Sequence, residues 1–120
     1  DITTTSATYA STGISMTLNV GPSGIAMIEV TAGLFQSTTA TISNLRINRD
    51  SATAYYQVTG KNLALTGTAD LNFNQVHRIT GLSPGNHTFL LEWKTNGGTL
   101  QCRTASQPEN ELMTMTGWSF

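Results

Sequence analysis

Alternation of apolar and polar side chains constrains the fold of this chain more than any other feature. Between Ile14 and Val20, every second residue is apolar and the residues between them are Ser, Thr and Asn. Successive side chains of a β-strand point to opposite faces of a sheet, so this pattern predicts a strand with one buried face and one solvated face. The segment 21–24, Gly-Pro-Ser-Gly, follows directly and predicts a turn.

The same pattern recurs along the chain, with turn signals about every ten residues. No segment longer than about ten residues shows the 3.6-residue period of an amphipathic helix. The sequence therefore predicts an all-β fold, a two-sheet antiparallel β-sandwich of the jelly-roll kind. We expect one domain over residues 1–120, with residues 1–10 as an N-terminal arm or tether. The predicted strands are 14–20, 25–35, 40–48, 54–59, one or two strands within 63–73, 76–80, 87–94, a strand opening with Leu100 and Cys102, and 112–118.

The segment Asn96-Gly97-Gly98 is the strongest local turn signal. Asn-Gly between alternating strands favours a type I′ hairpin, because that turn needs positive φ at both central residues. We therefore expect the strand that opens with Leu100 to return alongside 87–94.

Composition excludes several classes of protein. Only 11% of the residues are charged and the formal net charge is -1. Nucleic-acid binding by phosphate neutralisation needs a basic patch, which the six scattered Lys and Arg residues do not provide. No apolar run approaches the roughly 18 residues that span a bilayer. Cys102 is the single cysteine, so we expect no intrachain disulfide and interpret Cys102 as a small buried hydrophobe.

Residues that carry chemistry are sparse. His77 and His87 lie ten residues apart on different predicted strands, without metal-ligand spacing, and are interpreted as structural. Glu92 and Lys94 share a strand face and are expected to form a solvated pair. General acid-base or nucleophilic catalysis needs titratable groups brought together, and the sequence offers no such pair. We therefore expect no catalytic residues, no metal site and no cofactor.

Aromatic residues divide into expected core and candidate binding residues. Phe89 and Trp93 share the parity of the buried face of their strand. Tyr55 and Tyr56 are adjacent, so on a strand one of them faces outward, and Trp118 near the C-terminus could meet a neighbouring subunit. Tyr and Trp are frequent anchors of binding surfaces. Tyr55, Tyr56 and Trp118 are the candidate ligand- or partner-binding residues.

The segment 79–99 resembles a known family. It contains Gly-Leu-Ser-Pro-Gly-Asn-His-Thr (81–88), then a strand ending in Leu-Glu-Trp-Lys-Thr (91–95) and a glycine turn. This pattern resembles C-terminal jelly-roll domains of bacteriophage tail and receptor-binding proteins, and the segments 12–18 and 23–30 are similar to the opening strands of that family. The resemblance implies a virion surface module made in the host cytoplasm, commonly a homotrimer. Apolar residues on the second strand face, such as Ile25, Met27 and Leu90, would then pack between subunits.

Two functions of a virion module stay open, because a fold does not determine a function. The first is a receptor-binding or tail-fibre tip domain that attaches to a host cell-surface glycan or protein. The second is a capsid decoration or head-fibre protein that contacts other virion proteins. A carbohydrate-binding module of a non-viral protein is a further alternative. All three are non-enzymatic, with no nucleic-acid partner and no insertion into a membrane.

Overall fold

The computed structural model describes residues 2–36, 41–58, 63–65, 70–102 and 113–120. Over these residues the chain forms strands and no helix. The strands are β1 (Ile2–Thr4), β2 (Ala10–Val20), β3 (Ala26–Gln36), β4 (Thr41–Arg49), β5 (Ala54–Gln57), β6 (Leu63–Leu65), β7 (Asp70–Ile79), β8 (Gly85–Thr95), β9 (Leu100–Cys102) and β10 (Thr114–Ser119).

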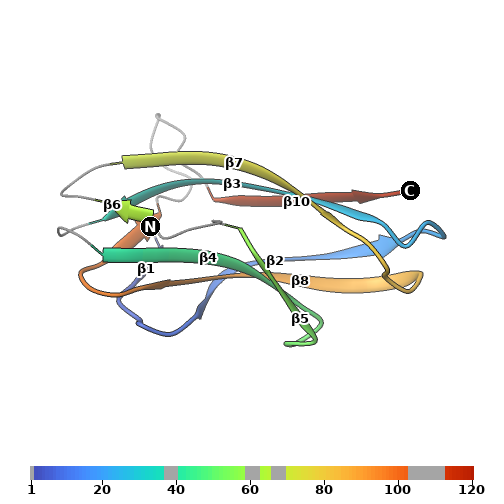
Figure 1. Ribbon diagram of the computed structural model, residues 1–120, viewed down its shortest axis with the longest axis horizontal. Helices are drawn as coiled ribbons and strands as arrows, with labels where there is room; N and C mark the ends of the chain where they lie inside the picture. Colours follow the sequence, from blue (N-terminus) through green and yellow to red (C-terminus); the bar gives the residue numbers. More distant parts are fainter. Residues whose placement is uncertain (1, 37–40, 59–62, 66–69, 103–112) are drawn as a thin grey trace.

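The strands form two antiparallel sheets that face each other as two layers (Figure 1). In sheet A, β3 pairs with β7 along one edge and with β10 and then β9 along the other, and β1 pairs with β9. In sheet B, β8 lies between β2 and β4, and β5 and β6 pair with different parts of β4. The chain passes repeatedly from one sheet to the other, as in a jelly roll. The predicted all-β sandwich is confirmed.

The core fills the space between the two sheets. Phe89, Leu91 and Trp93 of β8 are at most 1% exposed, as the alternation of 87–94 predicts, and Cys102 is also buried. They pack in one cluster with residues of β3 and β4 such as Ile28 and Leu45. Each large side chain buried in this way contributes about 1.5–3 kcal/mol to stability. The side chains of this cluster are therefore apolar because they are buried between the two sheets.

The predicted Asn-Gly hairpin is wrong. Strand β9 does not return beside β8 but crosses to sheet A, where it pairs with β1 and β3. Of the residues 96–98, only Gly98 has positive φ, at 63°, so the turn lacks the two positive φ values of type I′. β10 pairs only with 26–31 of β3, which leaves the edge at 34–36 for β9. Sheet pairing and burial of Leu100 outweigh the local turn preference.

Two strand boundaries also differ from the prediction. β2 begins at Ala10, ahead of the predicted start at 14, because a register shift between Ser11 and Ser15 interrupts the alternation. β7 runs without a break from Asp70 to Ile79, so 76–80 is not a separate strand.

The predicted arm at 1–10 contains β1, which pairs with β9. The turn at Lys61, the break at Gly67, the loop at 107–110 and the start of the last strand at 112 lie outside the described residues.

Candidate functional site

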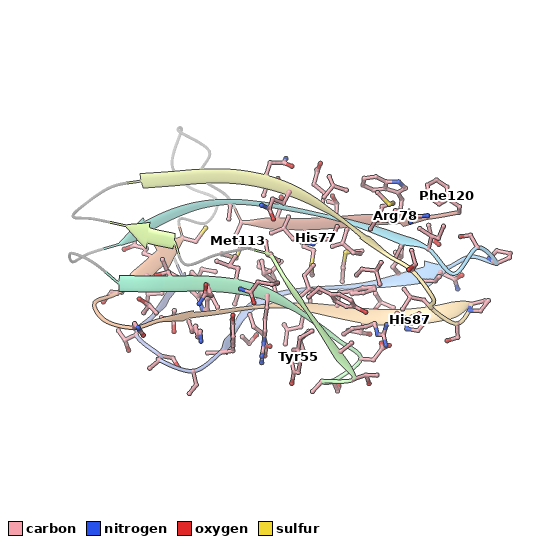
Figure 2. All side chains as sticks on the ribbon, in the orientation of Figure 1. Tyr55, His77, Arg78, His87, Met113 and Phe120 are labelled. Carbon is pink, nitrogen blue, oxygen red and sulfur yellow. The ribbon has the colours of Figure 1, made fainter. Side chains whose placement is uncertain are left out.

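The outward face of sheet B carries a row of side chains across its four main strands. Ser15 of β2 lies opposite Leu90 of β8, Leu90 lies opposite Asn48 of β4, and Asn48 lies opposite Tyr55 of β5. Tyr55 is 48% exposed and points away from sheet A (Figure 2). The pairing of four strands therefore fixes the spacing of these side chains on a rigid surface.

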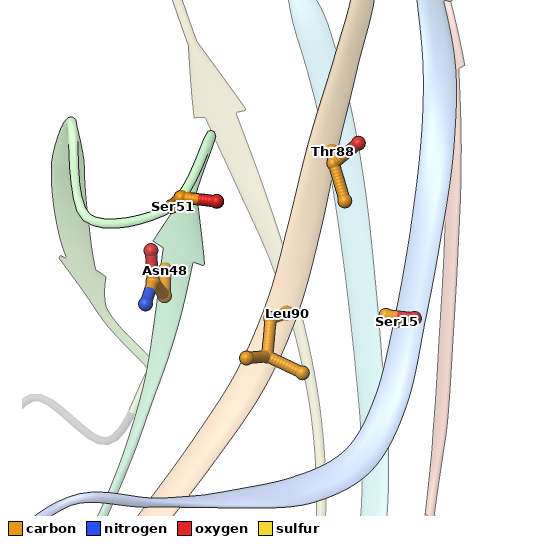
Figure 3. A pocket seen from close by; sticks show the side chains of 5 residues that line it. All are labelled: Ser15, Asn48, Ser51, Thr88 and Leu90. Carbon is orange, nitrogen blue, oxygen red and sulfur yellow. The ribbon is translucent and has the colours of Figure 1, made fainter.

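A shallow pocket lies over this row (Figure 3). Its volume is about 250 Å³, and its lining comprises Ser15, Asn48, Ser51, Thr88 and Leu90. Four of the five residues carry an uncharged hydroxyl or amide group, and Leu90 supplies apolar surface between them. The exposed surface of the lining is mostly apolar, so the pocket combines an apolar contact area with a few polar groups that can orient a ligand.

The turn that carries Ser51 has a rare backbone conformation. Asp50, Ser51 and Ala52 have φ values of 49°, 55° and 74°, all in the left-handed region. This region costs an L-residue other than glycine about 1–2 kcal/mol. The N–H of Ala52 donates to Oδ1 of Asn48 at 2.6 Å, and the N–H of Asp50 donates to the carbonyl oxygen of Thr88 at 2.8 Å. These bonds hold the turn against its backbone strain.

The Asp50 carboxylate fastens the turn to β8. Its Oδ1 accepts a hydrogen bond from the N–H of Thr88 at 2.8 Å, and its Oδ2 lies 2.6 Å from Nδ1 of His87 and 3.6 Å from Nε of Arg49. Desolvation raises the pKa of Asp50, but the bonds from His87 and Thr88 and the two nearby cations outweigh it and hold this pKa below its usual range. The pKa of His87 is raised, chiefly by its bond to Asp50 and then by its bond to the carbonyl oxygen of Ser83. These bonds outweigh desolvation and the charge of Arg49, which both lower this pKa. We call this interaction the Asp50–His87 clamp.

The clamp has the order of a Ser-His-Asp triad, because Oγ of Ser83 lies 3.4 Å from Nε2 of His87. The carbonyl oxygen of Ser83 is closer, at 2.8 Å from the same nitrogen. Both ring nitrogens therefore face acceptors, which fits a doubly protonated ring whose Nε2 cannot take a proton from the Ser83 hydroxyl. The residue after Ser83 is Pro84, which has no N–H to stabilise an oxyanion. The arrangement is suited to holding the turn and not to activating a nucleophile.

An aromatic and cationic cluster lies next to the pocket on the same face. The guanidinium carbon of Arg46 lies 4.0 Å from the ring centroid of Tyr9 and 3.8 Å from that of Tyr55, within the range of cation–π contacts. Nε of Arg46 donates to Glu92 at 2.8 Å, so Arg46, and not Lys94 as predicted, is the ion-pair partner of Glu92. Nζ of Lys94 lies 4.9 Å from the centroid of Tyr9. These five residues form what we call the tyrosine–arginine cluster.

The three candidate residues from the sequence lie in three different environments. Tyr55 belongs to the tyrosine–arginine cluster and is the last residue of the row that crosses sheet B from Ser15. Tyr56 faces the other side of β5, where its hydroxyl accepts a hydrogen bond from Arg49 at 2.8 Å. Trp118 is 44% exposed on the outward face of sheet A, on the opposite side of the molecule. The structure therefore does not bring these residues into one site.

The outward face of sheet A is more apolar than that of sheet B. Trp118 lies opposite Met27, Met27 lies opposite Arg78, and Val76 lies opposite Glu29 in the next row. Val76 is 47% exposed, and Phe120, which lies near Arg78 in Figure 2, is 64% exposed. We call these residues the sheet A patch. Met27 thus lies on the outward face of sheet A, whereas Leu90 lies in the pocket on the outward face of sheet B, so one subunit contact would not cover both.

His77 is the second histidine and faces the core from the edge strand β7. It lies opposite the buried Ile28, and its Nε2 is buried without a hydrogen-bond partner among the described residues. Burial lowers the pKa of His77. Among the described residues, no group of three or more His, Cys, Asp or Glu side chains is placed to hold a metal ion.

Of the candidate residues predicted from the sequence, only Tyr55 lies beside the pocket, and the other residues of the candidate site were not predicted. The Asp50–His87 clamp joins residues 37 positions apart, and Arg46 and Glu92 are 46 positions apart. Only the pairing of β4 with β8 brings them together, and no local motif announces that pairing. The one available signal was the outward parity of Arg46 and Asn48 on the predicted strand 40–48.

Comparison with known proteins finds no matching family model, no matching curated protein and no matching solved structure. No helix with the length and apolar character of a membrane span occurs among the residues described above.

Proposed function

We propose that this domain is a non-enzymatic virion surface module, a phage receptor-binding or tail-fibre tip domain that attaches to the host cell through the outward face of sheet B. The observation that carries the proposal is the tyrosine–arginine cluster beside a pocket. Tyr and Arg are the residue types that most often dominate binding energy at protein surfaces. Arg46 and Tyr55 lie on the paired strands β4 and β5, so little conformational entropy is lost when a partner binds. The family resemblance of segment 79–99 supplies the virion context.

The sheet A patch supports the proposed homotrimer. Exposed apolar side chains gathered on one face favour burial in a subunit contact. Glu29 and Arg78 lie on the same face and could pair with Arg78 and Glu29 of neighbouring copies. Light scattering tests this point: we expect three times the 12.8 kDa mass of one chain, and the substitution Trp118→Glu should yield monomers. A wild-type monomer at high concentration would contradict the trimer.

Attachment is tested by the binding of the labelled domain to a panel of bacterial strains. We expect binding to a subset of strains and a loss of at least tenfold in apparent affinity for Tyr55→Ala, which corresponds to about 1.4 kcal/mol. Asn96→Ala, at an exposed position after β8 that belongs to neither the tyrosine–arginine cluster nor the sheet A patch, is the matched control and should bind as wild type. Equal binding of Tyr55→Ala and wild type to every strain would contradict attachment through this face.

Capsid decoration is the second candidate, and the sheet A patch is the observation that favours it. An apolar sheet face can pack on a capsid protein as well as on a second copy of this chain. Binding to isolated capsids that Trp118→Glu abolishes, without binding to any cell, would favour decoration over attachment. A non-viral carbohydrate-binding module would use the same face of sheet B but would show neither a trimer nor binding to capsids.

A further inference from the structure

We propose that the pocket over Leu90 is a subsite for one uncharged saccharide ring, with Tyr55 as the contact for the next ring along the chain. This inference rests on the proposed attachment function, for which it names the ligand class and the position of the ligand.

The size of the pocket limits the ligand to a small group. Pockets for drug-sized molecules have volumes of about 300–1,000 Å³. The volume here is about 250 Å³, and the pocket opens broadly on the sheet surface. A single ring can enter it while the rest of a longer ligand lies outside, along the row that ends at Tyr55.

The polar groups of the lining match a polyhydroxylated ligand. The hydroxyls of Ser15 and Ser51 can each donate and accept hydrogen bonds, as sugar hydroxyls do. The hydroxyl of Thr88 lies 3.2 Å from that of Thr17 on β2, so a ligand would share this hydrogen bond or replace it. Oδ1 of Asn48 is occupied by the N–H of Ala52, so the Asn48 amide nitrogen is the group that remains for a ligand. This bond also fixes the orientation of the amide. Leu90 offers an apolar surface to the C–H face of a ring.

The charges around the pocket favour an uncharged ligand over an acidic one. None of the five lining residues is charged. The nearest charged groups are compensated within the protein, since Asp50 pairs with His87 and Arg46 pairs with Glu92. An acidic sugar would have to compete with an existing ion pair for its cation, and so would gain little from binding here.

The wall of the pocket is set before any ligand binds. Ser51 lies in the strained turn, and the Asp50–His87 clamp holds that turn on β8. Backbone strain of this kind persists where the surrounding bonds enforce it and often accompanies a binding site. A preset wall lowers the entropy that a weak ligand must overcome.

The test uses the full chain and defined sugars as probes. Saturation-transfer NMR and calorimetry are run with N-acetylglucosamine, methyl glucoside and methyl galactoside, and with glucuronate and sialic acid as acidic probes. We expect at least one neutral sugar to bind and both acidic sugars to bind at least tenfold more weakly. Ser15→Trp should fill the pocket from the solvated side of β2 and reduce neutral-sugar affinity at least tenfold.

Asn19→Trp is the matched control. Asn19 lies on the same face of β2, four residues from Ser15 and opposite Asn86, so its substitution should leave sugar affinity unchanged. Thermal unfolding of both variants shows whether the fold survives, and Thr88→Val, which keeps the side-chain shape but removes a lining hydroxyl, gives a second measurement. No neutral-sugar binding, preference for acidic sugars, or binding that Ser15→Trp and Thr88→Val leave intact would overturn the inference.

Failure of this inference is distinguishable from failure of the attachment function. Strain binding that depends on Tyr55 but not on Ser15, without binding of any sugar, overturns the saccharide subsite and leaves attachment standing. Neutral-sugar binding that Ser15→Trp removes, with no binding to any strain, supports the subsite and contradicts host attachment.

Discussion

The Asp50–His87 clamp leads to a prediction whose size follows from its geometry. Asp50→Asn removes the carboxylate charge in the turn after β4 but keeps an oxygen for the N–H of Thr88, and Asn also tolerates the left-handed backbone. A hydrogen bond to a charged group stabilises a protein by about 1.5–3 kcal/mol. Because the Asp50 side chain is 31% exposed, solvent screening places the loss near the lower value. We expect a loss of about 1.5 kcal/mol in the free energy of unfolding, or roughly 6 °C in Tm.

The pH dependence of this loss identifies its origin. The pKa of His87 is raised in the folded state, so its contribution is complete below the unfolded value of 6.5 and disappears as pH rises through the folded value. The pKa of Asp50 is lowered, so its contribution is complete above 3.8 and disappears as pH falls through the folded value. The difference between wild type and Asp50→Asn should therefore be largest between pH 3.8 and 6.5 and should shrink at pH 9.

Urea unfolding at pH 6 and pH 9, with NMR titration of the His87 ring, measures both effects. Asn96→Ala changes an exposed residue at the other end of β8 from the clamp, outside the sheet A patch, and should change stability by no more than about 0.5 kcal/mol. A stability difference that is the same at pH 6 and pH 9, or a pKa of His87 that does not fall in Asp50→Asn, would refute the clamp.

Three further predictions concern the core and are checked by urea unfolding. His77→Leu removes a buried ring nitrogen that has no hydrogen-bond partner among the described residues, and should raise the free energy of unfolding by about 1 kcal/mol. Because the pKa of His77 is lowered, wild type should lose stability as pH falls below 6.5, and the variant should lack that contribution. Gly117→Ala would place Cβ 2.8 Å from Cε of Met16 and 2.9 Å from Cδ1 of Ile28, and should cost about 1–3 kcal/mol. Leu91→Ala empties a fully buried position and should cost about 2–5 kcal/mol. No change in any one of these variants would contradict the packing described for that residue.

The fold class could be predicted from the sequence because a strand with one buried face has an apolar side chain at every second position. The parity of 87–94 placed Phe89 and Trp93 in the core, where both are buried. Parity fails where the backbone departs from the regular pleat. At the start of β2, positive φ at Gly13 and the register shift between Ser11 and Ser15 hid four residues of strand.

Pairing between strands that lie far apart in the sequence could not be predicted from local sequence patterns. The Asn-Gly segment at 96–97 by itself favours a hairpin, but the strand that follows it, β9, pairs with β3 in sheet A. The candidate site depends on the same kind of information. Arg46 meets Glu92, Asp50 meets His87, and Asn48 lies opposite Leu90 only when β4 pairs with β8. Which of these side chains share one outward face therefore had to come from the structure.

The sheet A patch and the saccharide pocket lie on opposite sides of the sandwich, with the packed core between them. If copies of the chain associate through the patch, each pocket is left directed outward, and several low-affinity contacts can act together with an avidity roughly 10²–10⁴ times that of one. If the proposed host attachment and subunit contact both hold, the same separation would let substitutions on sheet B alter host range while the contacts between subunits stay intact.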